Sequence, residues 1–245
     1  MIPAWLAFID ALAAAALVLA GIVGAHYRFT APFVGFQIFV LGFFLAILAL
    51  FVGIVALFVT RKPPRRRARP QAMAGFVLGV VIAIPVVFKI VSTAKYPAIN
   101  DITTDVNNPP EFVHAEQLRA NRGRDMTYNK ALYAAAQEQG YGNVEPLALK
   151  ADPGTVFAQI QALASRMPGW EVTYTDPKTH TLEGVATSSL FHFKDDFVIQ
   201  VRAAGGGGSL VEMRSKSRDG VGDLGVNYNR IEDFFARLRI ENASG

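Results

Sequence analysis

The stretch GVGDLG at residues 220–225 has the glycine spacing G-x-G-x-x-G, which can hold a pyrophosphate against backbone N–H groups. It lies between an expected strand at residues 210–217 and an expected helix at residues 227–238. A dinucleotide site also needs a parallel βαβ unit with an acidic residue about twenty positions farther on. The preceding strand instead follows a GGGG hairpin, which predicts antiparallel pairing, and no second strand is expected after the helix. We therefore interpret GVGDLG as a strand-to-helix turn and expect no nucleotide and no other cofactor.

The polar residues of this turn predict local contacts. Asp223 and Asn227 can accept hydrogen bonds from backbone N–H groups at the start of the helix. Arg218, Asp219 and Asp223 are close enough in sequence to form an ion pair that fixes the loop. The D-x-D-x-D-G ladder of calcium loops is absent, so we expect no metal site.

Residue types that perform catalysis occur without a recognisable arrangement. The sequence has no cysteine, and its four histidines show no metal-ligand spacing such as H-E-x-x-H. A G-x-S-x-G nucleophile elbow does not occur. The adjacent carboxylates Asp195 and Asp196, together with Arg218, leave a hydrolase-type activity open. We expect no catalytic residues and favour a protein that is not an enzyme.

Three long apolar segments precede these residues, at 2–24, 33–60 and 72–92. Each is long enough to cross a bilayer, which takes about 20 helical residues. The loop at residues 61–70, RKPPRRRARP, carries six cations. Cytoplasmic loops are enriched in Lys and Arg, so we expect a three-helix membrane anchor over residues 1–94, with the loop and the N-terminus in the cytoplasm. The remainder is then periplasmic or extracellular, and the protein is integral to the plasma (inner) membrane.

Two ionisable residues lie inside these apolar segments. Such residues are expensive in a bilayer and are functional candidates for that reason. Lys89 stands near the outer end of its span and can extend to the interface, whereas Asp10 is a candidate for contact with another helix or a partner subunit.

The net charge of +4 is distributed unevenly along the chain. Residues 95–245 hold sixteen Lys and Arg against nineteen Asp and Glu, so the excess of cations belongs to the membrane segments. The basic pI therefore indicates membrane topology rather than nucleic-acid binding, and the expected partners are the lipid bilayer and a protein in a membrane complex.

The rest of the chain predicts an α+β fold. Residues 95–150 form an extended connector with one helix at 127–139, and residues 151–245 form the extracytoplasmic domain. Alternation of apolar and polar residues predicts four antiparallel strands, at 170–175, 181–187, 197–203 and 210–217, with helices on one face of the sheet. A helix begins after Asp152, and another buries apolar residues including Ile231 and Leu238.

Alternation also assigns the two faces of this sheet. Nine mostly apolar residues, including Tyr174 and Met213, are expected to point toward the helices. The opposite face carries charged residues and is expected to be uncovered, which makes it a candidate binding surface. The candidate binding residues on this face and in the following turn are Arg202, Arg214, Lys216, Arg218, Asp223 and Asn227.

The sequence around the turn resembles a known family. The run Arg214, Ser215, Ser217, Arg218, Gly220, Asp223, Gly225, Asn227, Arg230 and Ile231 is similar to the R-S-x-S-R-x-G-x-x-D-x-G-x-N-x-x-R-I signature of domain of unknown function 1499. YPAINDITTD followed by NPPEF resembles the beginning of that family's sequence. Residues 141–147 stand where its Y-P-D-I-x-P-L segment would be, with Gly142 and Asn143 in place of the Pro-Asp pair. The resemblance implies one recurrent module, often found beside membrane spans, and implies no catalytic residues.

Three functions remain open at this point. The first is a membrane-anchored extracytoplasmic binding or accessory module that contacts a protein or the cell envelope. The second is a binder of lipid or another apolar ligand, in a cavity lined by Trp170, Phe191, Phe193, Phe197, Phe234 and Phe235. The third is the hydrolase-type enzyme.

Overall fold

The computed structural model describes residues 1–142 and 144–244, with the side chain of Ser244 left out. The chain divides into two compact units. One holds residues 1–93 with residues 189–192, and the other holds residues 94–188 with residues 193–245. They are called here the membrane unit and the sheet unit.

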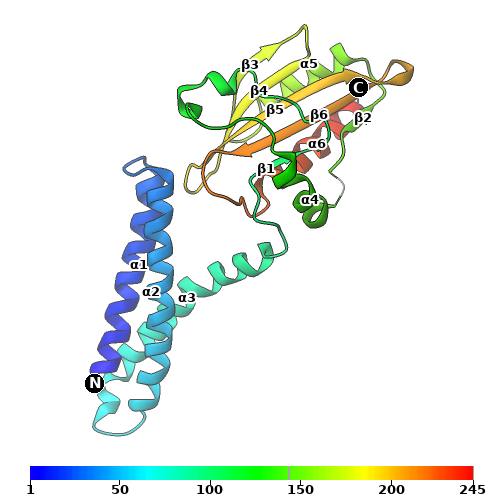
Figure 1. Cartoon of the computed structure of the whole chain (residues 1–245). Helices are drawn as coiled ribbons and strands as arrows, with labels where there is room; N and C mark the ends of the chain where they lie inside the picture. Colours follow the sequence, from blue (N-terminus) through cyan, green and yellow to red (C-terminus); the bar gives the residue numbers. More distant parts are fainter. Residues whose placement is uncertain (143, 245) are drawn as a thin grey trace. The chain divides into compact units, whose positions relative to one another are not determined.

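The membrane unit consists of three long helices joined by short connections (Figure 1). They are α1 (Ile2–His26), α2 (Pro32–Val59) and α3 (Arg69–Thr93), and a short helix η1 (Arg65–Ala68) precedes α3. All three are long and apolar enough to cross a membrane, which confirms the predicted number of spans. Small residues allow them to pack closely, because a Cβ on Gly75 would lie 2.6 Å from the backbone of Ala7.

The sheet unit contains a six-stranded antiparallel sheet in the order β1-β6-β5-β4-β3, with β2 paired to β6 beside β1 (Figure 1). The strands are β1 (Asp101–Thr103), β2 (Leu147–Leu149), β3 (Trp170–Asp176), β4 (Thr181–Thr187), β5 (Lys194–Ala203) and β6 (Ser209–Ser217). The prediction of four strands was wrong. Both missed strands come from residues 95–150, and each has three residues, which is too short to show an alternating pattern.

Of the helices in this unit, α5 (Pro153–Ala164) and α6 (Val226–Ser244) cover one face of the sheet. The third of the longer helices is α4 (Lys130–Tyr141). Single-turn helices occur at η2 (Ala115–Gln117), η3 (Arg119–Asn121) and η4 (Gly205–Gly207). Asp152 caps α5 as predicted, since its carboxylate accepts hydrogen bonds from the N–H groups of Gly154 and Thr155.

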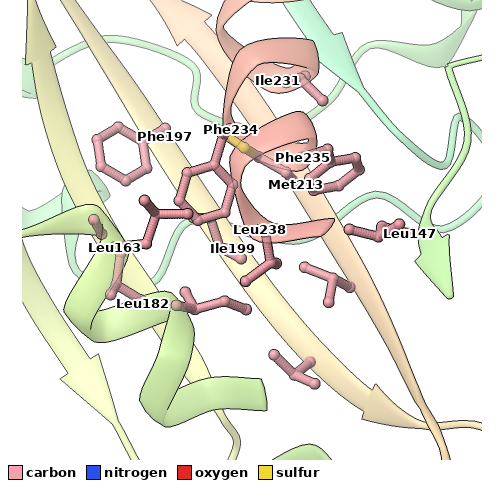
Figure 2. Packing of buried hydrophobic residues seen from close by; sticks show 14 of the residues in the cluster. Leu147, Leu163, Leu182, Phe197, Ile199, Met213, Ile231, Phe234, Phe235 and Leu238 are labelled. Atoms are coloured by element: carbon pink, nitrogen blue, oxygen red, sulfur yellow. The ribbon is translucent and has the colours of Figure 1, made fainter. Parts of the chain in front are cut away.

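The apolar core lies between the sheet and helices α5 and α6 (Figure 2). β5 and β6 contribute Phe197, Ile199 and Met213, and α6 contributes Phe234 and Leu238. These side chains are fully buried, so the alternation of β5 and β6 predicted this face of the sheet correctly. Together with α5 they make the packed layer that positions everything on the opposite face.

The end of β3 has its side chains on the faces opposite to those expected. The pairing of β3 with β4 shifts register between Val172 and Tyr174, and Tyr174 then stands opposite Glu183. Its ring stacks on His114, with ring centroids 5.4 Å apart. The prediction that Tyr174 points toward the helices was wrong, because a β-bulge inserts one residue and reverses the direction of the following side chains.

The charged face of the sheet is largely covered, which corrects the expectation that it is open to solvent. Residues 104–129, called here the covering segment, lie across this face and bond to it. The Met126 carbonyl accepts a hydrogen bond from Arg214 on β6, and Asn121 donates one to Asp196 on β5. Arg214 is 1% exposed and Asp196 is fully buried. Sequence alternation assigned these residues to the right face but could not show that an irregular segment covers it.

Candidate functional site

A buried ion-pair cluster on β1 and β6 lies beneath the covering segment. Asp101 accepts hydrogen bonds from Arg214 Nε at 2.9 Å and Nη2 at 2.8 Å, and from Lys216 Nζ at 2.8 Å. The antiparallel register places Asp101 opposite Lys216, so β1 delivers the carboxylate to both cations. Arg214 also lies near the rings of Phe112 and Tyr128, at 4.8 and 5.4 Å from their centroids. Two cations on one carboxylate leave this cluster with a net positive charge.

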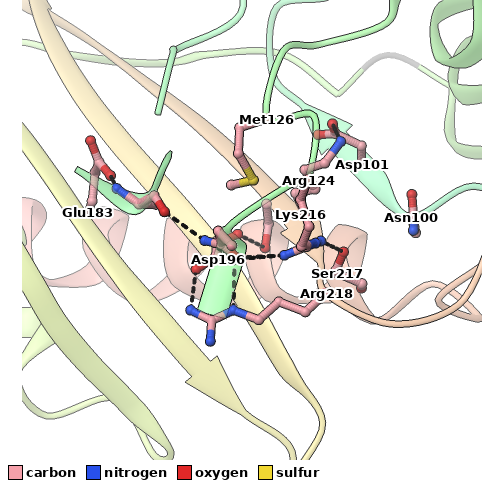
Figure 3. Close-up of polar contacts among 12 residues, drawn as sticks. Asn100, Asp101, Arg124, Met126, Glu183, Asp196, Lys216, Ser217 and Arg218 are labelled. Carbon is pink, nitrogen blue, oxygen red and sulfur yellow. Dashed lines mark hydrogen bonds and ion pairs between the residues drawn. The ribbon is translucent and has the colours of Figure 1, made fainter. Parts of the chain in front are cut away.

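Asp196 on β5 is the centre of a second cluster. Its carboxylate accepts hydrogen bonds from Arg218 Nε and Nη2, at 2.9 and 2.6 Å, in the bidentate geometry that suits guanidinium and carboxylate. Arg124 and Asn121 of the covering segment donate to it from the other side, at 3.4 and 3.1 Å. Figure 3 shows Arg124 and Arg218 converging on Asp196. The predicted local pair of Arg218 with Asp219 or Asp223 was wrong, because Arg218 reaches across to β5 instead.

The third cluster joins β5 and β6 to α6. Arg230 of α6 pairs with Asp195 and also donates to the hydroxyl of Ser215. Asn227 accepts from the same hydroxyl at 2.7 Å and donates to the Ser217 hydroxyl at 2.9 Å. The hydroxyl of Ser215 is therefore engaged by two neighbours, and the amide of Asn227 fixes the first turn of α6 against β6.

Glu183 on β4 is fully buried, and its carboxylate is bound by backbone alone. Its oxygens accept hydrogen bonds from the N–H groups of Val113, His114 and Ala115, at 2.7, 2.9 and 2.6 Å. These N–H groups lie at the start of η2, where the helix dipole favours a negative charge. Glu183 thus holds the covering segment down on β4, as Asp196 does on β5.

Another ion pair lies at the more open end of β6. Arg202 Nε and Glu212 Oε2 are 3.0 Å apart, and the Arg202 side chain is half exposed. Burial raises the pKa of Glu212, and the nearby Arg202 guanidinium opposes that rise. Of the predicted binding residues, Arg202 is the most exposed, whereas Arg214, Lys216 and Asn227 are buried.

The turn at residues 220–225 joins β6, which is antiparallel to β5, to α6. Asp223 accepts hydrogen bonds from the N–H groups of Gly225 and Asn227, as expected, and thereby begins α6. Gly225 has φ 84°, and a Cβ there would lie 2.5 Å from the ring of Tyr96. The glycine is required by that positive φ and by the close ring.

The side chain of Gln137 covers the outer edge of the sheet at β1. Gln137 of α4 accepts a hydrogen bond from the Thr103 N–H at 3.1 Å and donates one to the Thr103 carbonyl at 2.7 Å. An exposed strand edge invites pairing with another chain. The buried amide of Gln137 imitates a neighbouring strand at this position and closes the edge of β1.

One cleft of about 360 Å³ opens beside the first cluster. It is lined by Val106, Asn107, Asn108, Pro109, Glu111, Phe112, Glu116, Met126, Thr127, Tyr128, Lys130 and Arg214. Within the described residues the buried Tyr128 hydroxyl has no hydrogen-bond partner. Burial raises the pKa of Tyr128, so the hydroxyl stays protonated and can donate. Arg214 Nη1 makes only a long contact, 3.5 Å, with the Pro110 carbonyl.

The residues suggested for a hydrolase and for an apolar-ligand cavity do not line the cleft. Asp195 and Asp196 are both buried and paired with arginines, on the strand and not in the cleft. Trp170 packs against Phe197 and Phe234 in the apolar core, with ring centroids 4.1 and 5.2 Å apart. Phe235 is buried in the same core, whereas Phe191 belongs to the membrane unit and Phe193 begins the second stretch of the sheet unit.

The two ionisable residues of the spans lie in α1 and α3. Asp10 is partly exposed in α1, and Lys89 is exposed near the end of α3. They do not form an ion pair with each other or with any other described residue. Any charged partner of these two side chains must therefore come from outside the described residues.

Several residues of the site were not anticipated from the sequence. Asp101 binds the cations of β6, Glu183 binds the N–H groups of η2, and Asn121 and Arg124 bind the Asp196 carboxylate. Tyr128 lines the cleft. The sequence around Asp101 gives no local signal of its role, because its partners are more than 110 positions away. A buried charge requires a partner of opposite charge. The cations on β6 were therefore the feature of the sequence from which a buried carboxylate elsewhere in the chain could have been predicted.

Fold and site together define a class of protein. It is an antiparallel α+β module that follows candidate membrane helices, and its charged face is largely covered by the covering segment. The chain belongs to the family described as protein of unknown function (DUF1499), which matches residues 101–238. The match runs from the first residue of β1 into α6 and confirms the resemblance seen in the sequence. A search of curated proteins gave no match.

Proposed function

We propose that the protein is a membrane-anchored binding module without catalytic activity, displayed outside the cytoplasm and serving as an accessory to a partner protein. The basic loop at residues 61–70 supports this orientation, because cytoplasmic loops carry the excess of Lys and Arg. α3 begins inside that loop, so the sheet unit follows on the opposite side of the membrane. In a bacterial cell this membrane is the plasma (inner) membrane.

The observation that carries the binding role is the cleft beside Arg214. Elsewhere on the charged face, carboxylates and cationic side chains bind each other and the covering segment, which supports a structural role for them. The cleft is different, because the Tyr128 hydroxyl is unpartnered within the described residues and Arg214 Nη1 is weakly engaged. Both groups donate hydrogen bonds. They suit a partner segment that brings acceptor oxygens, such as backbone carbonyls or a carboxylate.

Photo-crosslinking tests this assignment. A photoreactive amino acid replaces Thr127, which lines the cleft, in the full-length protein expressed in its membrane. The matched control places it at Leu132, an exposed residue of α4 that does not line the cleft. We expect a discrete adduct with a partner from position 127 and none from position 132, and the adduct should be lost in Tyr128→Phe. Equal labelling at both positions would remove the cleft as the binding site.

The orientation is tested separately with cysteine reporters, which the chain permits because it has no cysteine. Arg67→Cys places a thiol in the basic loop, and Lys150→Cys places one on an exposed position of the sheet unit. A membrane-impermeant maleimide added to intact cells should label position 150 but label position 67 only after permeabilisation. The reverse pattern would put the sheet unit in the cytoplasm.

A further inference from the structure

The turn between β6 and α6 carries apolar side chains that the described residues leave largely exposed. Val221 at its tip is 83% exposed and Leu224 is 54% exposed. Leu224 also has φ 55°, in the left-handed region that asparagine or glycine adopts with less strain. Neither packing nor backbone geometry therefore favours a leucine at this position, although backbone strain of this kind is retained where a site requires it.

The same turn is bonded to the residues that leave the membrane helix. The Asp223 N–H donates to the Ile99 carbonyl at 3.1 Å, and the Asn100 amide donates to the Gly220 carbonyl at 2.6 Å. Gly222 packs against Ala98, where a Cβ would lie 3.0 Å from the Ala98 Cα. The turn is thus fixed on residues 96–100, a stretch of the sheet unit itself.

Chain length places that stretch close to the bilayer. α3 ends at Thr93, so only Ala94 and Lys95 separate it from Tyr96. Three peptide steps span at most about 10 Å. α3 has 25 residues and is about 37 Å long, which exceeds the hydrocarbon core of about 30 Å, so a helix that crosses the bilayer along its normal reaches the headgroup region at one or both ends. This distance limit follows from covalent connection alone and holds for any orientation of the two units.

An aromatic cluster stands at the same place. Tyr96 stacks on Tyr141 with ring centroids 5.1 Å apart, and Tyr141 stacks on Tyr228 at 4.8 Å. Tyrosine is enriched where a protein meets the membrane–water interface. Lys95, whose Nζ lies 4.9 Å from the centroid of the Tyr96 ring, adds a cation of the kind that anionic lipid headgroups attract.

We propose that the membrane surface covers this turn, with Val221 and Leu224 lying in the lipid headgroup region as a second point of attachment beside α3. A shallow loop of apolar residues gains from leaving water at this depth without crossing the bilayer. Two points of attachment restrict rotation of the sheet unit about its tether and hold the cleft beside Arg214 at a defined height. The proposal is independent of whether that cleft binds a partner.

Fluorescence quenching in nanodiscs tests the proposal. Val221→Cys and Leu224→Cys in the full-length protein carry an environment-sensitive dye, in phosphatidylcholine nanodiscs with and without a lipid bearing a nitroxide near its headgroup. Ala203→Cys is the control, because Ala203 is exposed at the opposite end of the hairpin of β5 and β6. We expect lipid quenching at least about threefold stronger at 221 and 224 than at 203, and aqueous iodide quenching weaker by a similar factor.

Two results would overturn the proposal. Equal iodide access at positions 203, 221 and 224 would place the turn in water. Protection from iodide without quenching by the lipid nitroxide would mean that protein covers the turn, either a second copy or a partner.

A second variant checks that the apolar side chains cause the contact. Val221→Asp with Leu224→Asp should abolish lipid quenching of a dye at Asp219→Cys, with the fluorescence of the core residue Trp170 unchanged as evidence of folding. Aspartate tolerates positive φ, so position 224 accepts it without added strain. Retained lipid quenching in this variant would equally contradict the proposal.

Discussion

The two faces of the sheet are both largely covered, yet they are held by different interactions. On one face, Phe197, Met213 and their neighbours pack against α5 and α6. On the other, Asp101, Glu183 and Asp196 bind cations and N–H groups of β6 and the covering segment. The first face needs only apolar residues of suitable volume, whereas the second requires each charge to find its own partner.

This difference has a structural consequence for the covering segment. Apart from η2 and η3 it has no regular secondary structure, so its position depends on side-chain contacts with the strands beneath. The buried carboxylates select one arrangement of the segment because a displaced segment would leave them unpaired. In our interpretation the apolar face supplies most of the stability, and the charged face determines where the segment and its cleft lie.

The largest expected loss of stability comes from removing Asp101, the carboxylate that binds two cations on the charged face. Asp101→Ala leaves Arg214 and Lys216 buried side by side without their carboxylate, and we expect the free energy of unfolding to fall by about 3–5 kcal/mol. The measurement is urea unfolding of the full-length protein in detergent, followed by Trp170 fluorescence. Phe234→Ala on the apolar face should cost a similar 3–5 kcal/mol.

The control for this comparison is Asp219→Ala, which removes an exposed carboxylate from the same sheet unit. Its effect should stay within about 0.5 kcal/mol. If Asp101→Ala cost as little as Asp219→Ala, the charged face would contribute no stability and the contrast between the faces would be wrong.

A smaller loss is expected where backbone alone binds the carboxylate. Glu183→Gln places an amide NH₂ group among three N–H donors, so at least one donor loses its acceptor. Hydrogen bonds to a charged group contribute about 1.5–3 kcal/mol, and we expect a loss in that range. Amide hydrogen exchange should also accelerate at residues 113–115. Glu171→Gln, on the exposed side of β3, is the matched control and should change neither quantity.

A third effect depends on pH and concerns the start of α6. Burial raises the pKa of Asp223, although the N–H groups of Asn227 and Gly225 oppose that rise. The folded protein therefore binds a proton at Asp223 more readily than the unfolded chain does, and the native state loses stability from this group as pH rises above about 3.9, the pKa of an unfolded Asp.

Asp223→Ala removes both the helix cap and this titration. Loss of the cap costs about 1 kcal/mol. Only the wild-type protein loses stability from Asp223 as the pH rises. The difference in free energy of unfolding between wild type and variant should therefore be largest near pH 4 and smaller at pH 7. Urea unfolding at both pH values measures it. A deficit that grows toward pH 7 would mean that the hydrogen bonds to the carboxylate outweigh its burial.

Sequence patterns predicted the parts of this protein that depend on neighbours in the chain. The three apolar spans, the four longer strands and the cap at Asp152 follow from length, period and local hydrogen bonding. The bulge at Tyr174 and the short strands β1 and β2 leave no periodic signal. The covering segment was misread as a polar connector, because its prolines and Asx residues are typical of exposed turns.

The site was predictable to a lesser degree. Arg214, Lys216, Arg218, Asp223 and Asn227 were selected as a binding surface, and the structure places them in contacts within the chain. A cation on a strand looks the same in sequence whether it faces water or a carboxylate from a distant strand. Charge alternation therefore identifies a face of a sheet but not whether that face is covered, which depends on long-range pairing.

The smallest effect tests whether burial, rather than charge pairing itself, gives the charged face its importance. Arg237 and Asp233 form an ion pair four residues apart on α6, with side chains 51% and 53% exposed. Water solvates both groups well, so Asp233→Ala should cost only about 0.3–0.5 kcal/mol, and 1 M salt should reduce that cost further. The same salt should leave the loss in Asp101→Ala nearly unchanged, because screening acts weakly on buried pairs. Equal salt sensitivity of the two variants in urea unfolding would mean that the Asp101 cluster is open to solvent and that the covering segment does not seal it.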